Sequence, residues 1–297
     1  MEKNNNSIWL KSIPEKSYKT LEHNIATEVC IIGGGITGIS TAYYLSKQGI
    51  DVTVLEKDKI CSKTTGHTTG KITTQHGLFY KYLLDSQGKD YAKKYLYVNE
   101  KALNNIEKII NEEKIACDFE KRNSYVFTLM PNRVKDIQEE VNITRVLGAN
   151  SKFIQNLDIP LKIEAGIEFE NQAQFNPVKY VDGLCNCINK KGVRIYEDSK
   201  VIGYKRRGGK FEVLVKVGDE KYTVLADKVV VATRYPIFNF PGVYFIKTYQ
   251  ALEYAMCVKV NENIDSYNMY LSADTPNISF RTVLKDNERY LMVVRKW

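Results

Sequence analysis

The pattern of apolar and polar positions near the amino end predicts a strand, a tight turn, a helix and a second strand. The apolar run EVCII leads directly into the glycine-rich residues 33–38. Apolar residues then recur at helical spacing up to Gly49, and a second apolar run, DVTVL, ends at Glu56. A strand, glycine turn, helix and strand in this order are typical of the βαβ unit that binds dinucleotides.

The middle of the chain predicts helices with short strands between them. Apolar positions spaced by three and four predict a long amphipathic helix over residues 91–109. Further helices are expected over residues 133–147 and 178–190, and a strand over residues 124–130. Residues 64–77 are rich in Thr and Gly and follow neither period, which predicts a loop.

The later part of the chain is rich in β pattern. Short β runs separated by GG and GDE turns lead to VVVAT, an apolar run typical of a strand buried in a parallel sheet. From Tyr249 the pattern again predicts strands, with a turn at DNE. Segments of nucleotide-binding type therefore lie on both sides of a helix-and-strand block. We expect an α/β fold in which a Rossmann-like nucleotide-binding domain, residues 1–80 and 171–240, carries an inserted α+β substrate domain on a mixed or antiparallel sheet, residues 81–170 and 241–297.

The glycine turn fits the pattern G-x-G-x-x-G, in which each glycine has a physical role. Gly33 allows the tight turn, Gly35 lets the backbone approach a pyrophosphate, and Gly38 permits close packing of helix on strand. The helix start at Ile36 and Thr37 offers backbone N–H groups and the positive end of the helix dipole to the phosphates. Together these features predict a dinucleotide site, and they weigh against a glycine-rich turn in some other α/β protein.

The acidic end of the second strand narrows the choice of nucleotide. Glu56 can accept hydrogen bonds from ribose hydroxyls, and its charge disfavours a 2′-phosphate, so we do not expect NADP. An NAD enzyme usually continues with alternating strands and helices after this point. Here a long polar loop with small residues follows Lys57 instead.

The composition is that of an ordinary globular enzyme, with 43% hydrophobic and 26% charged residues. The net charge of +8 does not predict nucleic-acid binding, because the densest basic cluster, Lys205 to Arg207, flanks a GG hairpin turn and lacks interleaved aromatic residues. No apolar run reaches the roughly 18 residues of a membrane span. The polar amino end does not resemble a secretory signal, so we expect a cytoplasmic protein.

The six cysteines predict neither disulfides nor a metal site. They are spread along the chain without a disulfide-like framework. Cys185 and Cys187 lie two positions apart on an expected helix, so their thiols face different directions and are not expected to chelate together.

The polar segment CSKTTGHTTGKITTQHG resembles the loop that crosses the flavin in the D-amino-acid oxidase (DAO) family of FAD-dependent oxidoreductases. VVVAT followed by an arginine resembles that family's return to the nucleotide domain, which implies that Ala232 and Thr233 lie near the FAD. Val201 matches the position whose backbone meets the adenine. The resemblance therefore implies a flavoprotein with a Rossmann-like FAD-binding domain. The cofactor-binding residues that the motif and the resemblance imply are Gly33, Gly35, Ile36, Thr37, Gly38, Glu56, Lys57, Thr65, Gly66, Thr68, Thr69, Val201, Ala232 and Thr233.

A more specific resemblance is carried by TTGHTTGKITTQHG and the later NQAQFNPVKY. These runs are similar to a bacterial subgroup in which the flavoprotein module is fused to a C-terminal Rieske [2Fe-2S] domain. A Rieske site needs Cys-x-His pairs, and no cysteine here has a histidine two positions later, so we expect no Rieske domain. The sequence stops at Trp297, where the family continues into a glycine-containing loop and a helix facing the flavin. We therefore expect these C-terminal FAD-binding elements to be missing.

Two residues are expected to act in catalysis or substrate binding. His67 falls where some family members bond the flavin covalently, and the alternative is a loop histidine that bonds a backbone carbonyl or a phosphate. Arg281, near the end in ISFRTVLKDNERYLMV, matches the arginine that pairs with a substrate carboxylate, a role that its planar fork suits. The alternative is a surface arginine on an edge strand. Gln75 and His76 are expected to reach the face of the flavin.

The resemblance implies an FAD-dependent oxidoreductase that oxidises a small amine or amino acid by hydride transfer to flavin N5, while the protein supplies position and electrostatics. Electrons would then pass to oxygen or to a separate acceptor such as an iron–sulfur protein. Two alternatives stay open. One is a catalytically incomplete FAD-binding module that needs a partner chain, and the other is an NAD-dependent oxidoreductase.

Overall fold

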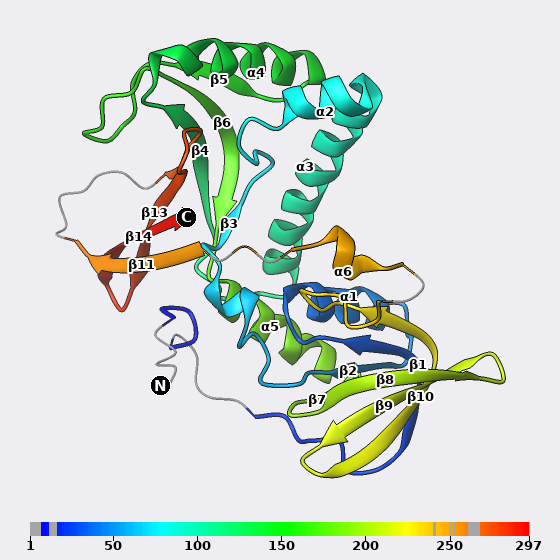
Figure 1. Cartoon of the computed structure of the whole chain (residues 1–297). Coiled ribbons are helices and arrows are strands. Elements are labelled where there is room, and N and C mark those ends of the chain that lie inside the picture. The colour runs from blue at the N-terminus through cyan, green and yellow to red at the C-terminus, as the bar shows by residue number, and fades with distance from the viewer. Residues whose placement is uncertain are drawn as a thin grey trace. The chain divides into compact units, whose positions relative to one another are not determined.

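The computed structural model of the chain divides into two compact units (Figure 1). Unit 1 comprises residues 1–68, 113–117 and 176–250, and unit 2 comprises residues 69–112, 118–175 and 251–297. The structure describes residues 7–11, 17–239, 242–249, 251, 253–260 and 268–296. Each unit contains one sheet of mixed strand direction with helices packed on it.

Unit 1 is built on a six-stranded sheet of order β7-β2-β1-β10-β9-β8. The strands are β1 (Ile25–Ile32), β2 (Val52–Leu55), β7 (Arg194–Tyr196), β8 (Lys200–Arg207), β9 (Lys210–Val217) and β10 (Glu220–Val231). β1 runs parallel to both β2 and β10, and β2 runs parallel to β7. The pairings of β10 with β9 and of β9 with β8 are antiparallel, so the expected hairpins follow the parallel part of the sheet.

The register of unit 1 aligns the carboxyl ends of its central strands. Ile32 of β1 pairs with Leu55 of β2 and with Val231 of β10. The residues that follow these three positions therefore emerge at one edge of the sheet, which is where α/β sheets bind their ligands. Segments far apart in the sequence meet there.

The helices of unit 1 have clear local origins. α1 (Ile36–Ser46) follows the glycine turn directly, and α5 (Pro177–Asn189) packs against it. α5 begins where Asn176 accepts hydrogen bonds from the backbone N–H groups of Val178 and Lys179, both at 3.1 Å, with proline in the first helical turn. A short helix, α6 (Tyr244–Lys247), follows the sheet.

The expectation of a fully buried VVVAT strand is wrong in part. Val229 and Val230 are half-buried, and Val231 is 42% exposed. The main helix contacts of this sheet are those of α1 with β2 and β1. The parallel direction of β10 is nevertheless as expected.

Unit 2 is built on an eight-stranded sheet with the path β11-β14-β13-β12-β4-β6-β3, and β5 pairs with β6 beside this path. The strands are β3 (Lys71–Ile72), β4 (Glu120–Thr128), β5 (Ser151–Ile154), β6 (Ala165–Gln174), β11 (Glu253–Lys259), β12 (Met269–Ser272), β13 (Ile278–Lys285) and β14 (Glu288–Lys296). The pairing of β12 with β4 is parallel and the other pairings are antiparallel.

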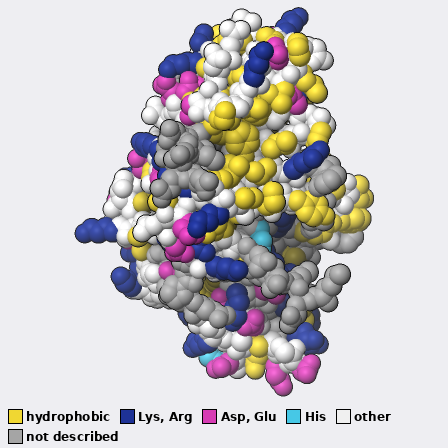
Figure 2. Space-filling model, turned by 90° about the vertical axis from the view of Figure 1, so that its left-hand side faces the viewer, with side chains coloured by type: hydrophobic (Ala, Val, Ile, Leu, Met, Phe, Trp, Pro, Cys, Tyr) yellow, Lys and Arg dark blue, Asp and Glu magenta, His cyan; other side chains and the backbone are white. Residues whose placement is uncertain are grey.

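Helices cover one part of the sheet of unit 2. α2 (Tyr80–Gln87), α3 (Lys89–Glu112) and α4 (Val134–Leu147) bury apolar side chains against β4 and β6, with Tyr80, Ile137 and Ile167 fully buried in this core. β11, by contrast, is exposed along its length. On the face drawn in Figure 2, hydrophobic side chains form a continuous patch with Lys and Arg side chains scattered around it.

The mixed α/β fold agrees with the expected fold class. The unit boundaries differ from the expected domain boundaries. The chain enters unit 2 after residue 68 instead of residue 80, and residues 113–117 return to unit 1. The last segment of unit 1 is 176–250 instead of 171–240. The loop expected over residues 64–77 contains a 3₁₀ turn, η1 (Thr64–His67), and the short strand β3. β3 depends on pairing with the distant β6, which the local sequence pattern does not reveal.

Candidate functional site

The glycine turn of unit 1 has the geometry that its sequence predicts. Gly33 adopts φ +113°, a conformation that L side chains rarely adopt, and a Cβ there would lie 2.7 Å from the carbonyl oxygen of Ala232. The N–H of Gly33 donates to Leu55 (2.8 Å), and the N–H of Ala232 donates to Ile32 (2.8 Å). Thr233 lies at the same place, since its nitrogen would be 3.4 Å from a Cβ at Gly33. The structure therefore brings these predicted residues together.

The start of α1 lies close to the glycine turn and to Thr65. A Cβ at Gly38 would overlap the carbonyl group of Gly33, so the helix packs closely on the turn. No acidic side chain lies in the first turn of α1. The Oγ1 of Thr65 accepts the N–H of Ile36 at 3.0 Å and would be 3.1 Å from a Cβ at Gly35. Because this oxygen accepts one bond, the hydroxyl proton of Thr65 can be donated to a phosphate at the helix start.

Glu56, which follows β2, bonds the glycine turn through its side chain. Its carboxylate accepts the N–H of Gly34 at 2.7 Å and that of Asp58 at 2.9 Å, and the residue is 9% exposed. The carboxylate retains lone pairs that can accept ribose hydroxyls. Sequence reasoning gave Glu56 only the ribose role, and the structure adds that it holds the glycine turn in place.

A segment that sequence reasoning missed braces the polar loop of unit 1. The indole Nε1 of Trp9 donates to the carbonyl of Thr68 at 2.6 Å, and the hydroxyl of Ser7 donates to the carbonyl of Gly66. A Cβ at Gly66 would lie 2.7 Å from the Leu10 side chain. Trp9 is 3% exposed. The apolar IWL inside an otherwise polar amino end was the signal for this contact.

The remaining predicted residues of unit 1 occupy varied positions. His67 is exposed, and its Nδ1 lies 2.7 Å from the carbonyl oxygen of Lys63, an arrangement that matches the alternative of a loop histidine bonded to a carbonyl. Lys57 and Thr37 are exposed. The side chain of Val201 belongs to the core beneath the sheet. Their contacts with a cofactor remain predictions.

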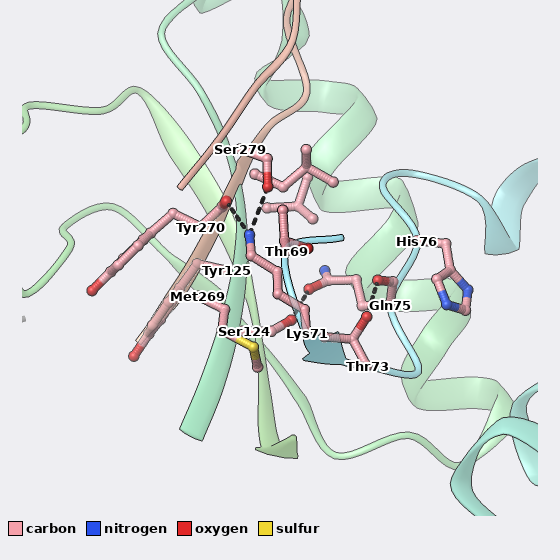
Figure 3. A pocket seen from close by; sticks show the side chains of 12 residues that line it. Thr69, Lys71, Thr73, Gln75, His76, Ser124, Tyr125, Met269, Tyr270 and Ser279 are labelled. Atoms are coloured by element: carbon pink, nitrogen blue, oxygen red, sulfur yellow. Dashed lines mark hydrogen bonds between the residues drawn. The ribbon is translucent and has the colours of Figure 1, made fainter. Parts of the chain in front are cut away.

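Unit 2 contains a cavity of about 210 Å³ (Figure 3). It is lined by Thr69, Lys71, Thr73, Gln75, His76, Ser124, Tyr125, Val126, Met269, Tyr270, Leu271 and Ser279. These residues come from β3 and the segments beside it, from β4, from β12 and from β13. Thr69 therefore lies in unit 2, and among the predicted cofactor residues it is the one placed outside unit 1.

A lysine that sequence reasoning missed reaches into this cavity. The Nζ of Lys71 donates to the carbonyl of Tyr270 at 2.8 Å and to the hydroxyl of Ser279 at 2.7 Å (Figure 3). Burial, and secondly the positive charge of Arg281, lower the pKa of Lys71 to about 7. Nothing local in GKITT distinguished this lysine from the other lysines of the chain.

Arg281 lies in the interior of the sheet of unit 2. It is 3% exposed on β13, whose neighbours are β12 and β14, so the alternative of a surface arginine on an edge strand is wrong. Its Nε donates to the carbonyl of Thr69 at 2.5 Å and its Nη2 to that of Phe175 at 3.2 Å. Burial lowers the pKa of Arg281 to about 9, against the influence of Glu120. Among the described residues, Arg281 is not one of those that line the cavity.

Two further groups at the cavity carry hydrogen-bonding capacity. The Oε1 of Gln75 accepts the hydroxyl of Ser124 at 2.7 Å, whereas its Nε2 is buried without a partner. His76 bonds the hydroxyl of Tyr95 through Nδ1 at 2.7 Å, and burial lowers its pKa. The structure thus places Gln75 and His76 together at this cavity.

A cluster of metal ligands and a membrane-spanning helix are both absent from the described residues. Among the described residues, no group of three or more His, Cys, Asp and Glu side chains could hold a metal ion. In the same part of the chain, no helix is both long enough and apolar enough to cross a membrane.

The turn, the acid after β2 and the return of β10 are together typical of a dinucleotide-binding protein. The FAD-dependent oxidoreductase (DAO) family matches residues 28–258, and the chain belongs to this family. A Bacillus subtilis (strain 168) protein, YhfW, whose name carries the words Rieske 2Fe-2S iron-sulfur protein, is 31% identical over 96% of this chain and 55% of its own length. The gamma-glutamylputrescine oxidoreductase of Escherichia coli (strain K12) is 24% identical over 62% of this chain and 44% of its own length. The chain therefore spans about half the length of these relatives.

Solved structures agree with the fold. L-proline dehydrogenase from P. horikoshii superposes with a TM-score of 0.71 at 18% identity, covering 91% of this chain and 70% of its own. Glycine oxidase from Bacillus cereus superposes with a TM-score of 0.67 at 16% identity, covering 91% and 71%. At this level of identity the likeness concerns the fold alone.

Proposed function

We propose that this chain binds FAD at the glycine turn of unit 1 and oxidises a small amine or amino acid by hydride transfer to flavin N5. The observation that carries the proposal is the convergence of the turn, Glu56, Thr65 and Ala232 at one edge of the sheet. Family membership supports FAD as the nucleotide.

The residues present fit this cofactor. A pyrophosphate needs a close backbone approach, and any side chain at Gly33 or Gly38 would meet backbone atoms. The start of α1 and the Thr65 hydroxyl would bind the phosphates, while Glu56 would accept the ribose hydroxyls. The backbone of Val201 is proposed to contact the adenine. Ala232 and Thr233 are proposed to lie near the FAD, as the family resemblance implies.

FAD supplies the hydride acceptor when it is bound, and the chain supplies binding and electrostatics. The cavity of unit 2 is proposed as the place of the substrate, because it combines polar groups with aromatic rings. In this reading no side chain has to remove the hydrogen, since the lone pair of a neutral amine assists the departure of the hydride. Burial lowers the pKa of His76, which makes this side chain a candidate for taking up the ammonium proton of the incoming substrate.

The electrons are proposed to leave through a separate acceptor, either an iron–sulfur protein or oxygen. The name of YhfW, which carries an iron–sulfur term, supports the first choice. Oxygen consumption measured with and without an added iron–sulfur protein would separate the two.

A visible absorption spectrum tests the proposal. The full chain is mixed with FAD, freed of unbound nucleotide by gel filtration, and titrated anaerobically with a panel of amino acids and amines. We expect flavin absorption bands that bleach with at least one amine. A chain that stays colourless, or that binds NADH and excludes FAD, overturns the proposal. Acid precipitation of the flavin-loaded chain then separates the two readings of His67, because covalent flavin stays in the pellet.

A further inference from the structure

We infer that Lys71, and not Arg281, is the side chain that binds the anionic group of the substrate, in the cavity of unit 2. The inference rests on the proposed function for the claim that the ligand is a substrate. It specifies a substrate class: small amines that also carry a carboxylate, with an apolar body beside it.

The ammonium group of Lys71 has hydrogen-bonding capacity left for a ligand. An ammonium group carries three protons, and the two acceptors of Lys71 are the Tyr270 carbonyl and the Ser279 hydroxyl. Both acceptors are neutral. Across the part of the chain that the structure describes, no carboxylate forms an ion pair with Lys71. A partly buried ammonium without an anion is unfavourable, and a bound carboxylate would compensate it.

A second, independent group at the cavity points to the same kind of ligand. Gln75 is 5% exposed, and its Nε2 is a buried donor without a partner, while the other end of the amide bonds Ser124. A buried donor left unpaired costs free energy, so it favours a ligand with an acceptor oxygen. A carboxylate has two oxygens and can serve both Lys71 and Gln75.

Arg281 does not line the cavity, but its positive charge influences Lys71. Its guanidinium donates to the carbonyls of Thr69 and Phe175, so these groups hold it in the sheet. Its positive charge reaches Lys71, since it is one of the two causes that lower the pKa of the lysine. An anion in the cavity is therefore attracted by two cations, and only Lys71 lines the cavity. Arg281 is a positioning residue for Thr69 and a source of electrostatic potential.

The rings of two tyrosines, Tyr125 and Tyr270, give the cavity an apolar wall. The rings of Tyr125 and Tyr270 stack with centroids 5.4 Å apart. The hydroxyl of Tyr125 donates to Glu168 at 2.9 Å and that of Tyr270 donates to Asp158 at 2.5 Å. Figure 3 shows both hydroxyl ends directed away from Lys71, so the acids stay on the far side and the rings form the wall. This wall suits an apolar or aromatic body next to the anionic group.

Binding of a matched pair of probes tests the inference. Phenylacetate and its neutral analogue phenylacetamide are titrated calorimetrically into the full chain with FAD added. The variant Lys71→Met keeps the aliphatic stem and removes the charge, and Lys135→Met removes an exposed lysine of unit 2 as the matched control. We expect Lys71→Met to weaken phenylacetate binding by about tenfold or more, and Lys135→Met to leave it unchanged. Phenylacetamide should bind more weakly than phenylacetate to the native chain and equally to native and Lys71→Met.

Several results would overturn the inference. They are equal affinities of the native chain for acid and amide, an unchanged phenylacetate affinity in Lys71→Met, and no measurable binding of phenylacetate to the native chain. Lys71→Gln, which keeps a polar head group, replaces Lys71→Met if the latter does not fold, and the same loss is expected.

The readout separates this inference from the proposed function. Lysine-dependent phenylacetate binding by a chain that takes up no FAD would leave the inference standing and remove the oxidoreductase. A chain that takes up FAD and is reduced equally well by amines with and without a carboxylate would keep the oxidoreductase and overturn the role of Lys71.

Discussion

The glycine turn of unit 1 and the cavity of unit 2 differ in how the chain builds them. The turn is made by residues 33–38, which are contiguous and whose spacing carries the chemistry. The cavity is assembled from β3, β4, β12 and β13, which the sequence separates widely. The turn needs backbone shape, whereas the cavity needs side chains brought together by strand register. Different substitutions should therefore damage them.

The largest effect is expected at Gly33. Gly33→Ala places a Cβ 2.7 Å from the Ala232 carbonyl oxygen in addition to straining φ at +113°. Gly49→Ala is the matched control, because Gly49 also has positive φ, +74°, but nothing lies within 4 Å of its Cβ position. We expect Gly33→Ala to cost about 2–4 kcal/mol of unfolding free energy and Gly49→Ala about 1 kcal/mol. Urea unfolding measures both, and equal costs would contradict the close approach described here.

Two buried carboxylates, Glu56 and Glu140, allow the two units to be compared by the same substitution. Glu56 accepts two backbone N–H groups in unit 1, and Glu140 accepts those of Tyr80 and Lys81, both at 2.8 Å, in unit 2. In Glu56→Gln and Glu140→Gln an amide NH₂ faces one N–H donor, which we expect to cost about 1–3 kcal/mol in each variant. Only Glu56→Gln should weaken FAD binding, measured by quenching of flavin fluorescence. A loss of the same size in Glu140→Gln would show that FAD binding reports general stability.

The stability of unit 2 is expected to depend on pH through Lys71. Folding lowers the pKa of Lys71 from 10.5 to about 7, so between these pH values the unfolded chain binds more protons at this site. Stability from Lys71 therefore rises with pH across that window and is lowest below pH 7. Removing the charge in Lys71→Met should raise stability relative to the native chain below pH 7, by about 1–2 kcal/mol after the lost hydrogen bonds, and the advantage should disappear by about pH 10.

Unfolding of both chains at a series of pH values checks this prediction. The pKa of His76 is also lowered, so that residue titrates below the window. Folding also lowers the pKa of Arg281, to about 9, so Arg281 too makes stability rise with pH. Arg281 is present in both the native chain and Lys71→Met. A stability difference that does not vary with pH would contradict the uncompensated charge of Lys71.

The smallest effect is expected where Trp9 contacts the polar loop at Thr68. Trp9→Phe keeps an aromatic ring but removes the bond from Nε1 to the carbonyl of Thr68. We expect a cost of about 1 kcal/mol and faster hydrogen exchange confined to residues 64–68. Exchange that is unchanged in this loop would show that the amino-terminal contact does not order it.

Sequence patterns predicted the turn well because its chemistry is local. The conformation of Gly33, the packing at Gly38 and the position of Glu56 follow from short-range spacing, and the structure places them as that spacing requires. The strands after Tyr249 and the turn at Asp286 and Asn287, both with positive φ, were also predicted from local pattern.

The cavity was not predictable in the same way. β3 has two residues and exists through its pairing with β6. β12 was missed because its short run pairs with β4, which is distant in the sequence. Lys71 acquires its properties from Tyr270, Ser279 and Arg281, none of which is near it in the sequence. The contacts of Glu56 with Gly34 and of Trp9 with Thr68 were not predicted either, because the two partners of each contact are distant in the sequence.

Binding of FAD at the glycine turn is tested by comparing how much FAD the native chain and Gly33→Ala retain. Both proteins are incubated with FAD, passed through a gel-filtration column and examined for flavin absorption in the protein peak. We expect the native chain to retain the flavin bands and Gly33→Ala to lose them, while Gly49→Ala behaves as the native chain does. A colourless native chain, or a Gly33→Ala variant that retains as much flavin as the native chain, would contradict binding of FAD at the glycine turn.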